Sequence, residues 1–184
     1  MSKPTYYYPD FVKVVRLKKT DSKRYWLELT IDDTKQERIT VILKNPSRAD
    51  QTFSDKTVYN VSNYIHRNRE NYKELKNIGA ITILNLIPNY LTDSSKLIAY
   101  KETLLDKENI LTLKKVCNKN QKVIIAWGNH PKGLYDEYDQ LKKSVMQILS
   151  DYGNEVFFVD RLTKAGNPKH GQVWAYKNKL RKLI

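Results

Sequence analysis

Four polar segments each follow an apolar run of the sequence, and they carry the side chains best suited to chemistry. They are Asn45-Pro46-Ser47, Asn85, Trp127-Gly128-Asn129 and the loop from Arg161 to Trp174. An asparagine amide can pair with a polar edge that offers one acceptor and one donor. The neutral imidazole of His170, in the last segment, can donate a hydrogen bond to developing negative charge. These residues could form one site if the fold brings the four segments together.

The apolar runs before these segments predict the strands of a sheet. Val12 to Leu17 and Tyr25 to Ile31 alternate apolar with polar residues, which predicts an antiparallel N-terminal β-hairpin with one solvated face. Near-continuous apolar runs are typical of strands that are covered on both faces. These runs are Arg38 to Leu43, Ala80 to Leu86, Lys122 to Trp127 and Val156 to Asp160.

Helices are expected between the buried strands. Apolar spacing predicts them at Lys56 to Leu75, at Ser95 to Val116 and after Pro131, with a short basic helix running to Ile184. This alternation predicts an α/β fold, a three-layer sandwich with a central, mostly parallel sheet flanked by helices, plus the N-terminal β-hairpin. Residues 1–184 would form a single domain, with 1–37 as an N-terminal extension. The polar segments would then meet in a crevice beyond the carboxyl ends of the strands.

The charge balance favours a polyanionic partner. Lys and Arg outnumber Asp and Glu by 33 to 20, which gives a formal net charge of +13. The chain also has 13 Tyr, and aromatic rings among cations suit stacking on bases. We therefore expect binding to nucleic acid, although a charge run such as the basic tail is usually a solvated helix face.

Other composition features limit the possible classes of protein. Cys117 is the only cysteine, so no internal disulfide can form and a reducing, cytoplasmic location is expected. Three histidines without paired cysteines offer no zinc-site spacing, and we expect no metal or cofactor. Residues Met1 to Phe11 contain no apolar signal core, and no segment approaches membrane-spanning length. No oligomerisation signature is visible, so a monomer is expected.

In their order along the chain, the segments between Thr40 and Trp174 resemble the motifs of the uracil-DNA glycosylase superfamily. Leu43-Lys44-Asn45-Pro46-Ser47 is similar to its water-binding motif, and Gly79 to Asn85, followed by Leu91-Thr92, is similar to its uracil-reading strand. Val123 to Gly128 resembles the apolar strand that ends in Trp-Gly. Pro168 to Trp174 falls where the superfamily has a His-containing loop that inserts into the duplex.

The resemblance has departures that bear on activity. The aspartate of the water-binding motif is Asn45 here, which resembles the mismatch-specific branch. Ser47 stands where a bulky residue would exclude the methyl group of thymine. Of the His-Pro-Ser-Pro frame, only His170 is kept.

The resemblance implies a metal-independent enzyme of DNA repair that flips uracil out of DNA and hydrolyses its N-glycosidic bond. Asn85 would pair with the O4 and N3–H of uracil, although it could instead be an ordinary asparagine at the end of a strand. Phe53 would stack on the base, although it could instead be a packing residue. Pro46 and Ser47 would complete the pocket. The departing uracil anion would accept a hydrogen bond from His170, which could instead be an exposed loop residue.

The water and the DNA need separate groups. Asn45 has no useful basicity but can hold the water, and Asp50 could supply a carboxylate if its loop folds back. An Asn45→Asp substitution is then expected to raise the rate. Backbone N–H groups of Gly128 and Asn129 would contact a phosphate. The segment from Lys169 to Trp174, which also contains Gly171, Gln172 and Val173, would contact the DNA. Trp174 is the first candidate for the wedge that fills the vacated base stack, although it could instead be a core residue, and Val173 is the second candidate.

Two other functions fit the same residues. The chain could be a non-catalytic DNA-binding module that has this fold, or it could act on another modified pyrimidine. The DNA itself, single-stranded or duplex, is not specified by the sequence.

Overall fold

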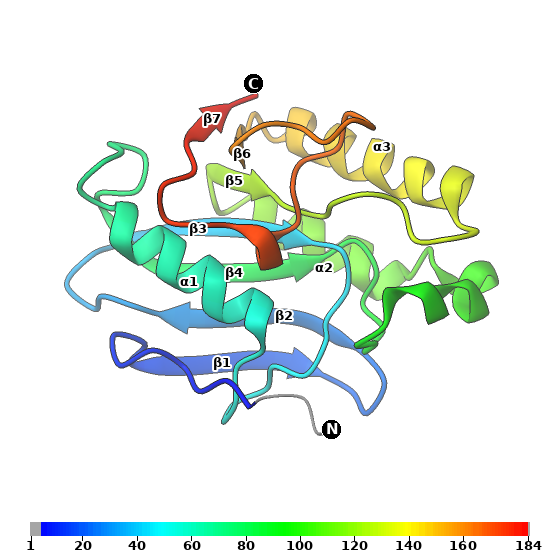
Figure 1. Cartoon of the computed structure of the whole chain (residues 1–184), viewed down its shortest axis with the longest axis horizontal. Helices are drawn as coiled ribbons and strands as arrows, with labels where there is room; N and C mark the ends of the chain where they lie inside the picture. Colours follow the sequence, from blue (N-terminus) through cyan, green and yellow to red (C-terminus); the bar gives the residue numbers. More distant parts are fainter. Residues whose placement is uncertain (1–4, 184) are drawn as a thin grey trace.

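A computed structural model describes residues 5–183. Outside this range lie residues 1–4, the start of the segment expected to lack a signal core, and Ile184, the expected end of the basic helix. Within it the chain forms a seven-stranded sheet in the order β1-β2-β4-β3-β5-β6-β7 (Figure 1). The strands are β1 (Val14–Lys19), β2 (Arg24–Thr30), β3 (Glu37–Leu43), β4 (Ile78–Asn85), β5 (Lys122–Ile125), β6 (Glu155–Val159) and β7 (Leu180–Lys182).

The expectation of a mostly parallel three-layer sandwich is wrong, because the sheet is mixed and dominates the fold. In residues 5–183, β1 with β2, β2 with β4 and β6 with β7 pair antiparallel, and the other three neighbouring pairs are parallel. The N-terminal hairpin pairs with the edge of β4 through β2 and so extends the sheet. The basic tail, expected as a helix, forms β7 on β6, since so short a segment gains more from pairing with a free strand edge than from helical turns.

The helices follow the expected positions with two corrections. They are α1 (Lys56–Asn68), α2 (Lys107–Cys117), α3 (Tyr135–Asp151) and the 3₁₀ segments η1 (Ser94–Thr103) and η2 (Gly171–Val173). Helix α1 ends at Asn68 and does not continue to Leu75. The long helix expected from Ser95 is divided, because Asp106 accepts a hydrogen bond from the Asn109 N–H and so begins a new helix.

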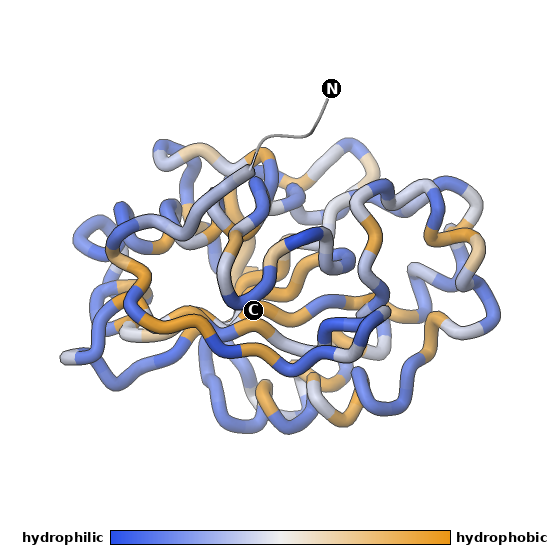
Figure 2. The backbone as a smooth tube through the Cα atoms, turned by 90° about the horizontal axis from the view of Figure 1, so that it is seen from below, coloured by the Kyte–Doolittle hydropathy of each residue, from blue (hydrophilic) through white to orange (hydrophobic). Residues whose placement is uncertain are grey.

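Each face of the sheet has its own apolar core. Helix α1 packs on one face through Val58, Val61 and Ile65, together with η2. Helices α2 and α3 pack on the opposite face through Leu113 and Leu141 (Figure 1). The hydropathy of the backbone tube follows this arrangement, with apolar strands at the centre and hydrophilic loops around them (Figure 2). No helix in residues 5–183 combines the length and the apolar character needed to cross a membrane.

The connections of β3 and β5 create the crevice in which a site can form. β3 is followed by α1 on one face, whereas its parallel neighbour β5 is followed by α3 on the other face. The two loops therefore diverge beyond the carboxyl ends of these strands. Ligand sites in open α/β sheets occur at such a point.

Candidate functional site

A cavity of about 420 Å³ lies at the carboxyl end of β3. Its walls come from the loop after β3, the start of α1, the loop after β4, the N-terminal segment and η2. The lining residues are Tyr6, Lys44, Asn45, Ser47, Arg48, Asp55, Lys56, Thr57, Leu91, Thr92, Ser94, His170 and Gln172. The fold thus brings together Asn45, Ser47, His170 and Gln172, four of the residues that the sequence singled out.

The side chain of Asn45 is held in one orientation by two backbone carbonyls. Its Nδ2 donates to the carbonyl oxygen of Leu91 at 2.7 Å and to that of Pro46 at 3.0 Å. Because both amide hydrogens are used, the Oδ1 atom is the part of Asn45 that can serve a ligand or a water. Pro46 ties the same two loops together, since its carbonyl also accepts from the Leu91 N–H at 2.9 Å.

His170 is held as a neutral hydrogen-bond donor. Its Nδ1 accepts from the Gln172 N–H at 3.2 Å, so the hydrogen of the neutral ring lies on Nε2. Burial lowers the pKa of His170 to about 4, and the neighbouring Lys44 ammonium acts in the same direction. The ring is therefore neutral at physiological pH and presents an N–H without carrying charge.

Close packing fixes η2, and with it His170, against α1. A Cβ atom at Gly171 would lie 2.7 Å from Val61 Cγ2 and 3.2 Å from Leu43 Cδ2, so only glycine fits there. Asn60 on α1 donates to the Gln172 carbonyl at 2.6 Å. Gly171 is therefore a close-packing residue that fixes the position of His170.

The carboxylate of the cavity is Asp55, which the sequence analysis missed. Asp55 is 6% exposed, and its two oxygens accept from the N–H groups of Val58 and Ala49 as it caps α1. The expected carboxylate, Asp50, lies outside the cavity lining, because its Oδ1 accepts from the N–H groups of Thr52 and Phe53 in its own turn. The sequence did contain a signal for this residue, because an Asp directly before an amphipathic helix is typical of an N-cap.

A buried arginine supports the loop that carries these groups. Arg24 at the start of β2 is 1% exposed, and its Nη1 donates to the Ala49 carbonyl at 2.9 Å. Its charge lies close enough to Asp55 to offset in part the lowering of the Arg24 pKa by burial. Arg24 therefore connects β2 to the loop between Asn45 and Asp55, a role that its position in a hairpin strand did not reveal.

Positive charge lies along the cavity. Lys44, Arg48 and Lys56 belong to the lining. Burial lowers the pKa of Lys44, and its ammonium lies 5.8 Å from the centre of the Tyr138 ring, a cation–π distance. An anionic ligand would therefore meet compensating charge here.

Asn85 is close to this site but does not line the cavity. It is completely buried, and neither its Nδ2 nor its Oδ1 has a hydrogen-bond partner among residues 5–183. Asn85 pairs in register with Leu43, and two residues earlier Ile83 packs in the core beneath α1, so its side chain faces that side of the sheet. An unpaired buried amide of this kind costs about 1–3 kcal/mol for each polar group. A ligand could use it only if the cavity deepened toward β4.

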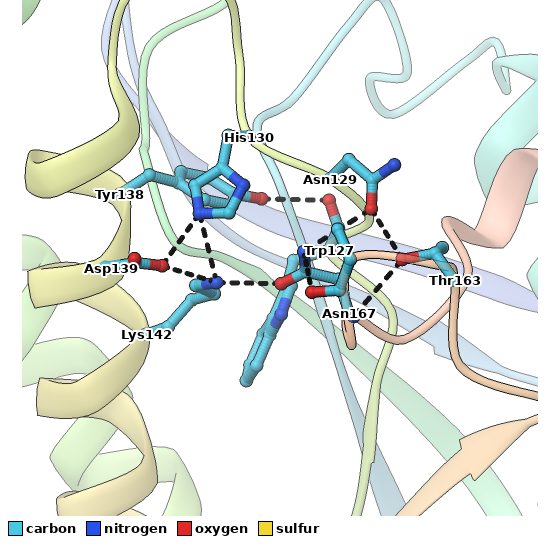
Figure 3. Close-up of polar contacts among 9 residues, drawn as sticks. Trp127, Asn129, His130, Tyr138, Asp139, Lys142, Thr163 and Asn167 are labelled. Atoms are coloured by element: carbon cyan, nitrogen blue, oxygen red, sulfur yellow. Dashed lines mark hydrogen bonds and ion pairs between the residues drawn. The ribbon is translucent and has the colours of Figure 1, made fainter.

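Several residues expected at the DNA surface are occupied within the protein. The Gly128 N–H donates to the Pro168 carbonyl at 3.1 Å, so the expected backbone contact of Gly128 with a phosphate is wrong. Lys169 forms an ion pair with Asp160 at 2.5 Å. Asn129 Oδ1 accepts from Thr163 Oγ1 at 2.7 Å and holds the loop after β6 (Figure 3).

Trp174 is a core residue and not a wedge. It is 6% exposed, and its ring meets Tyr64 edge-on with centroids 5.2 Å apart. Its Nε1 donates to the Lys169 carbonyl at 3.2 Å. The neighbouring Val173 is 63% exposed, so it is an apolar side chain that this loop presents to solvent.

A network of polar side chains lies beside the end of β5 and has a structural role (Figure 3). Lys142 on α3 contacts Asp139 at 2.7 Å and Asn167 Oδ1 at 2.7 Å, and His130 Nε2 lies 2.7 Å from Asp139. These contacts fasten the loops after β5 and β6 to α3. They frame the crevice without lining the cavity.

A larger groove, about 1,060 Å³, opens at the amino ends of β3 and β5. Each glutamate of its lining, Glu28, Glu37, Glu108 and Glu155, forms an ion pair with a lysine or arginine. Its carboxylates are therefore neutralised within the protein, and the groove lies at the end of the sheet opposite His170. Among residues 5–183 no group of three or more His, Cys, Asp or Glu side chains could hold a metal ion.

Comparison with known proteins gives one match. A family model described as "Protein of unknown function (DUF1643)" matches residues 24–171, which include β2 to β6 and every cavity residue except Tyr6 and Gln172. No curated protein matches the sequence, and no solved structure matches the fold.

Proposed function

This chain belongs to the DUF1643 family of proteins of unknown function, and we propose that it is a DNA glycosylase acting on uracil. It would hydrolyse the N-glycosidic bond of a flipped nucleotide and leave an abasic site. The observation that carries the proposal is the shared cavity of Asn45 and His170, which come from opposite ends of the family match. The volume of about 420 Å³ lies in the range of small-ligand sites.

His170 would act on the leaving group. As the bond between C1′ and N1 breaks, its electron pair departs with the uracil, and negative charge develops on the ring oxygens. The Nε2–H of a neutral His170 can donate to the O2 atom of that anion. A fixed donor of this kind contributes about 10²–10³ in rate.

Asn45 and Asp55 would act on the sugar side. The Oδ1 of Asn45 can accept a hydrogen bond from the attacking water, whose oxygen forms the new bond to C1′. Asp55, whose two oxygens accept from the N–H groups of Ala49 and Val58, can stabilise the positive charge on the sugar. It can also accept the proton that the water loses. This role replaces the one expected of Asp50.

The surroundings of the site support a DNA partner. Lys44, Arg48 and Lys56 line the cavity of a chain whose net charge is +13. Contacts of this kind bind phosphates without reading sequence. Cys117 is buried, and burial raises the pKa of its thiol to about 12, which fits work in the reducing cytoplasm.

A second candidate function is a DNA-binding module without catalysis. The burial of Asn85 outside the cavity favours it, because no other amide at the carboxyl end of β4 reaches the site to read a base. Action on another pyrimidine is the remaining alternative, which the small Ser47 in the lining favours.

One assay separates these functions. Labelled oligonucleotides with a single uracil, single-stranded or opposite adenine or guanine, are incubated with the protein and EDTA and then treated with alkali. Strand scission at uracil supports the proposal, and scission at another base supports the third function. Salt-sensitive binding without scission supports the second and overturns the first.

Variants connect the activity to the cavity. His170→Ala and Asn45→Ala should each lose at least tenfold in cleavage while still binding DNA. His66→Ala is the matched control, because His66 stacks on Phe11 at 3.8 Å and lies outside the cavity lining. If both site variants keep full activity, the assigned residues are wrong.

A further inference from the structure

Two pairs of aromatic rings lie beside the mouth of the cavity. Tyr6, in the lining, has its ring 5.8 Å from that of Tyr59 on the first turn of α1. The ring of the next residue, Tyr7, lies 5.6 Å from that of Phe53. We call these four residues the aromatic platform.

The platform is anchored in place. The Ser54 N–H donates to the Tyr6 carbonyl at 2.9 Å, and the hydroxyl of Tyr8 donates to the Asp50 carbonyl at 2.5 Å. These contacts hold the N-terminal segment to the loop that ends at Asp55, which itself lines the cavity. The platform and the cavity are therefore parts of one connected surface.

The exposure of these rings is not explained by packing. Tyr7 is 68% exposed, Phe53 41% and Tyr59 37%, so a large part of the surface of these three side chains remains in water. Contiguous exposed apolar side chains beside a pocket are typical of a binding surface. Rings of this kind, beside a cavity whose lining includes Lys56 and Arg48, suit stacking with the bases of an unpaired strand.

The segment from Lys169 to Trp174, where the resemblance places the wedge, presents no exposed Phe, Tyr or Trp side chain that could open a duplex. Trp174 is buried in the core, and Val173 is the exposed apolar side chain beside His170. A short aliphatic side chain fills little of a vacated base stack. Unpaired bases, in contrast, need no opening and can lie on the platform directly.

We propose that the aromatic platform binds the bases next to the target nucleotide, so that the substrate is single-stranded DNA. This inference rests on the proposed function for the nucleotide in the cavity. It adds that the protein prefers single-stranded to duplex DNA, and it names the surface responsible for this preference.

Binding is measured by fluorescence anisotropy with a labelled oligothymidylate that contains no uracil, alone and annealed to its complement. The wild-type protein should bind the single strand at least tenfold more tightly than the duplex. The Tyr7→Ala/Phe53→Ala double variant should lose tenfold or more in affinity for the single strand, since each stacked base contributes about five- to 100-fold. The Tyr7→Phe/Phe53→Tyr variant, which keeps both rings, should bind like wild type.

Tyr152→Ala is the control, because Tyr152 is also 37% exposed but lies at the far end of α3. It should change affinity less than twofold, and equal thermal unfolding of all variants shows that the fold is kept. Equal or tighter duplex binding, or normal single-strand binding by the double alanine variant, overturns the inference. Platform-dependent binding in a protein that never cleaves uracil would overturn the proposed function, and the platform would remain as a surface that binds single-stranded DNA.

Discussion

Asn45→Asp is the substitution for which the sequence and the structure give opposite expectations. By resemblance, an aspartate at this position should raise the rate of cleavage. In the structure, however, the amide donates to the carbonyls of Leu91 and Pro46 at 2.7 and 3.0 Å. A carboxylate cannot donate, so both hydrogen bonds would be lost and an anion would face two carbonyl oxygens.

The size of the effect follows from these contacts. Each lost hydrogen bond costs about 0.5–1.5 kcal/mol, and a half-buried carbonyl left unpaired adds to this. We expect the variant to lose about 2–4 kcal/mol of unfolding free energy at pH 7. The folded protein would favour the protonated carboxyl, which can still donate once, so the pKa of Asp at position 45 would rise above its unfolded value. The destabilisation should therefore be small below pH 4 and grow as the pH rises.

Urea unfolding followed by circular dichroism at several pH values measures this change. Asn63→Asp is a matched control, because Asn63 makes one exposed hydrogen bond, to the Tyr59 carbonyl, and should cost less than about 1 kcal/mol. A variant that is as stable as wild type and cleaves uracil faster would refute the reasoning about the Asn45 amide.

Three further predictions concern single residues of the site and its support. Because the pKa of His170 is about 4 when folded and about 6.5 when unfolded, the unfolded chain binds more protons between these values. Between pH 6.5 and 4 the unfolding free energy should thus fall by up to roughly 3 kcal/mol more in wild type than in His170→Ala, with no such difference above pH 6.5; equal profiles in urea titrations would contradict this. Asp55→Asn keeps the cap on Val58 but turns an amide donor toward the Ala49 N–H, so it should lose about 1–3 kcal/mol on unfolding. It should lower single-turnover cleavage at least tenfold, whereas Asp50→Asn should cleave normally; the reverse order would restore Asp50. Trp174→Ala should lose about 3–5 kcal/mol in urea unfolding because the ring is in the core, and a stable variant with impaired DNA binding would identify a wedge.

The sequence was informative where apolar periodicity and chain order decide the structure. The runs at Arg38 to Leu43 and Ala80 to Leu86 are strands, and the residues after β3 reach the same cavity as His170. Periodicity describes one element at a time, so it could not show that the hairpin joins β4 or that Leu180–Lys182 pairs with β6. These pairings make the sheet mixed.

Local chemistry explains most of the differences at the site. Asp50 closes its own turn through the Thr52 and Phe53 N–H groups, and Asp55 caps a helix, a choice that depends on the path of the loop. Trp174 is in the core because the loop turns back on α1 at Gly171. No pattern in the sequence distinguishes such a tryptophan from one that is exposed.

The central claim is that the cavity shared by Asn45 and His170 breaks the glycosidic bond of uracil. Single-turnover cleavage of a single-stranded uracil oligonucleotide, in EDTA and with enzyme in excess, tests it most directly. Wild-type protein should leave an alkali-sensitive site at the uracil, and His170→Ala should do so at least tenfold more slowly. Absence of cleavage by wild-type protein, or equal rates for the two proteins, would contradict the claim.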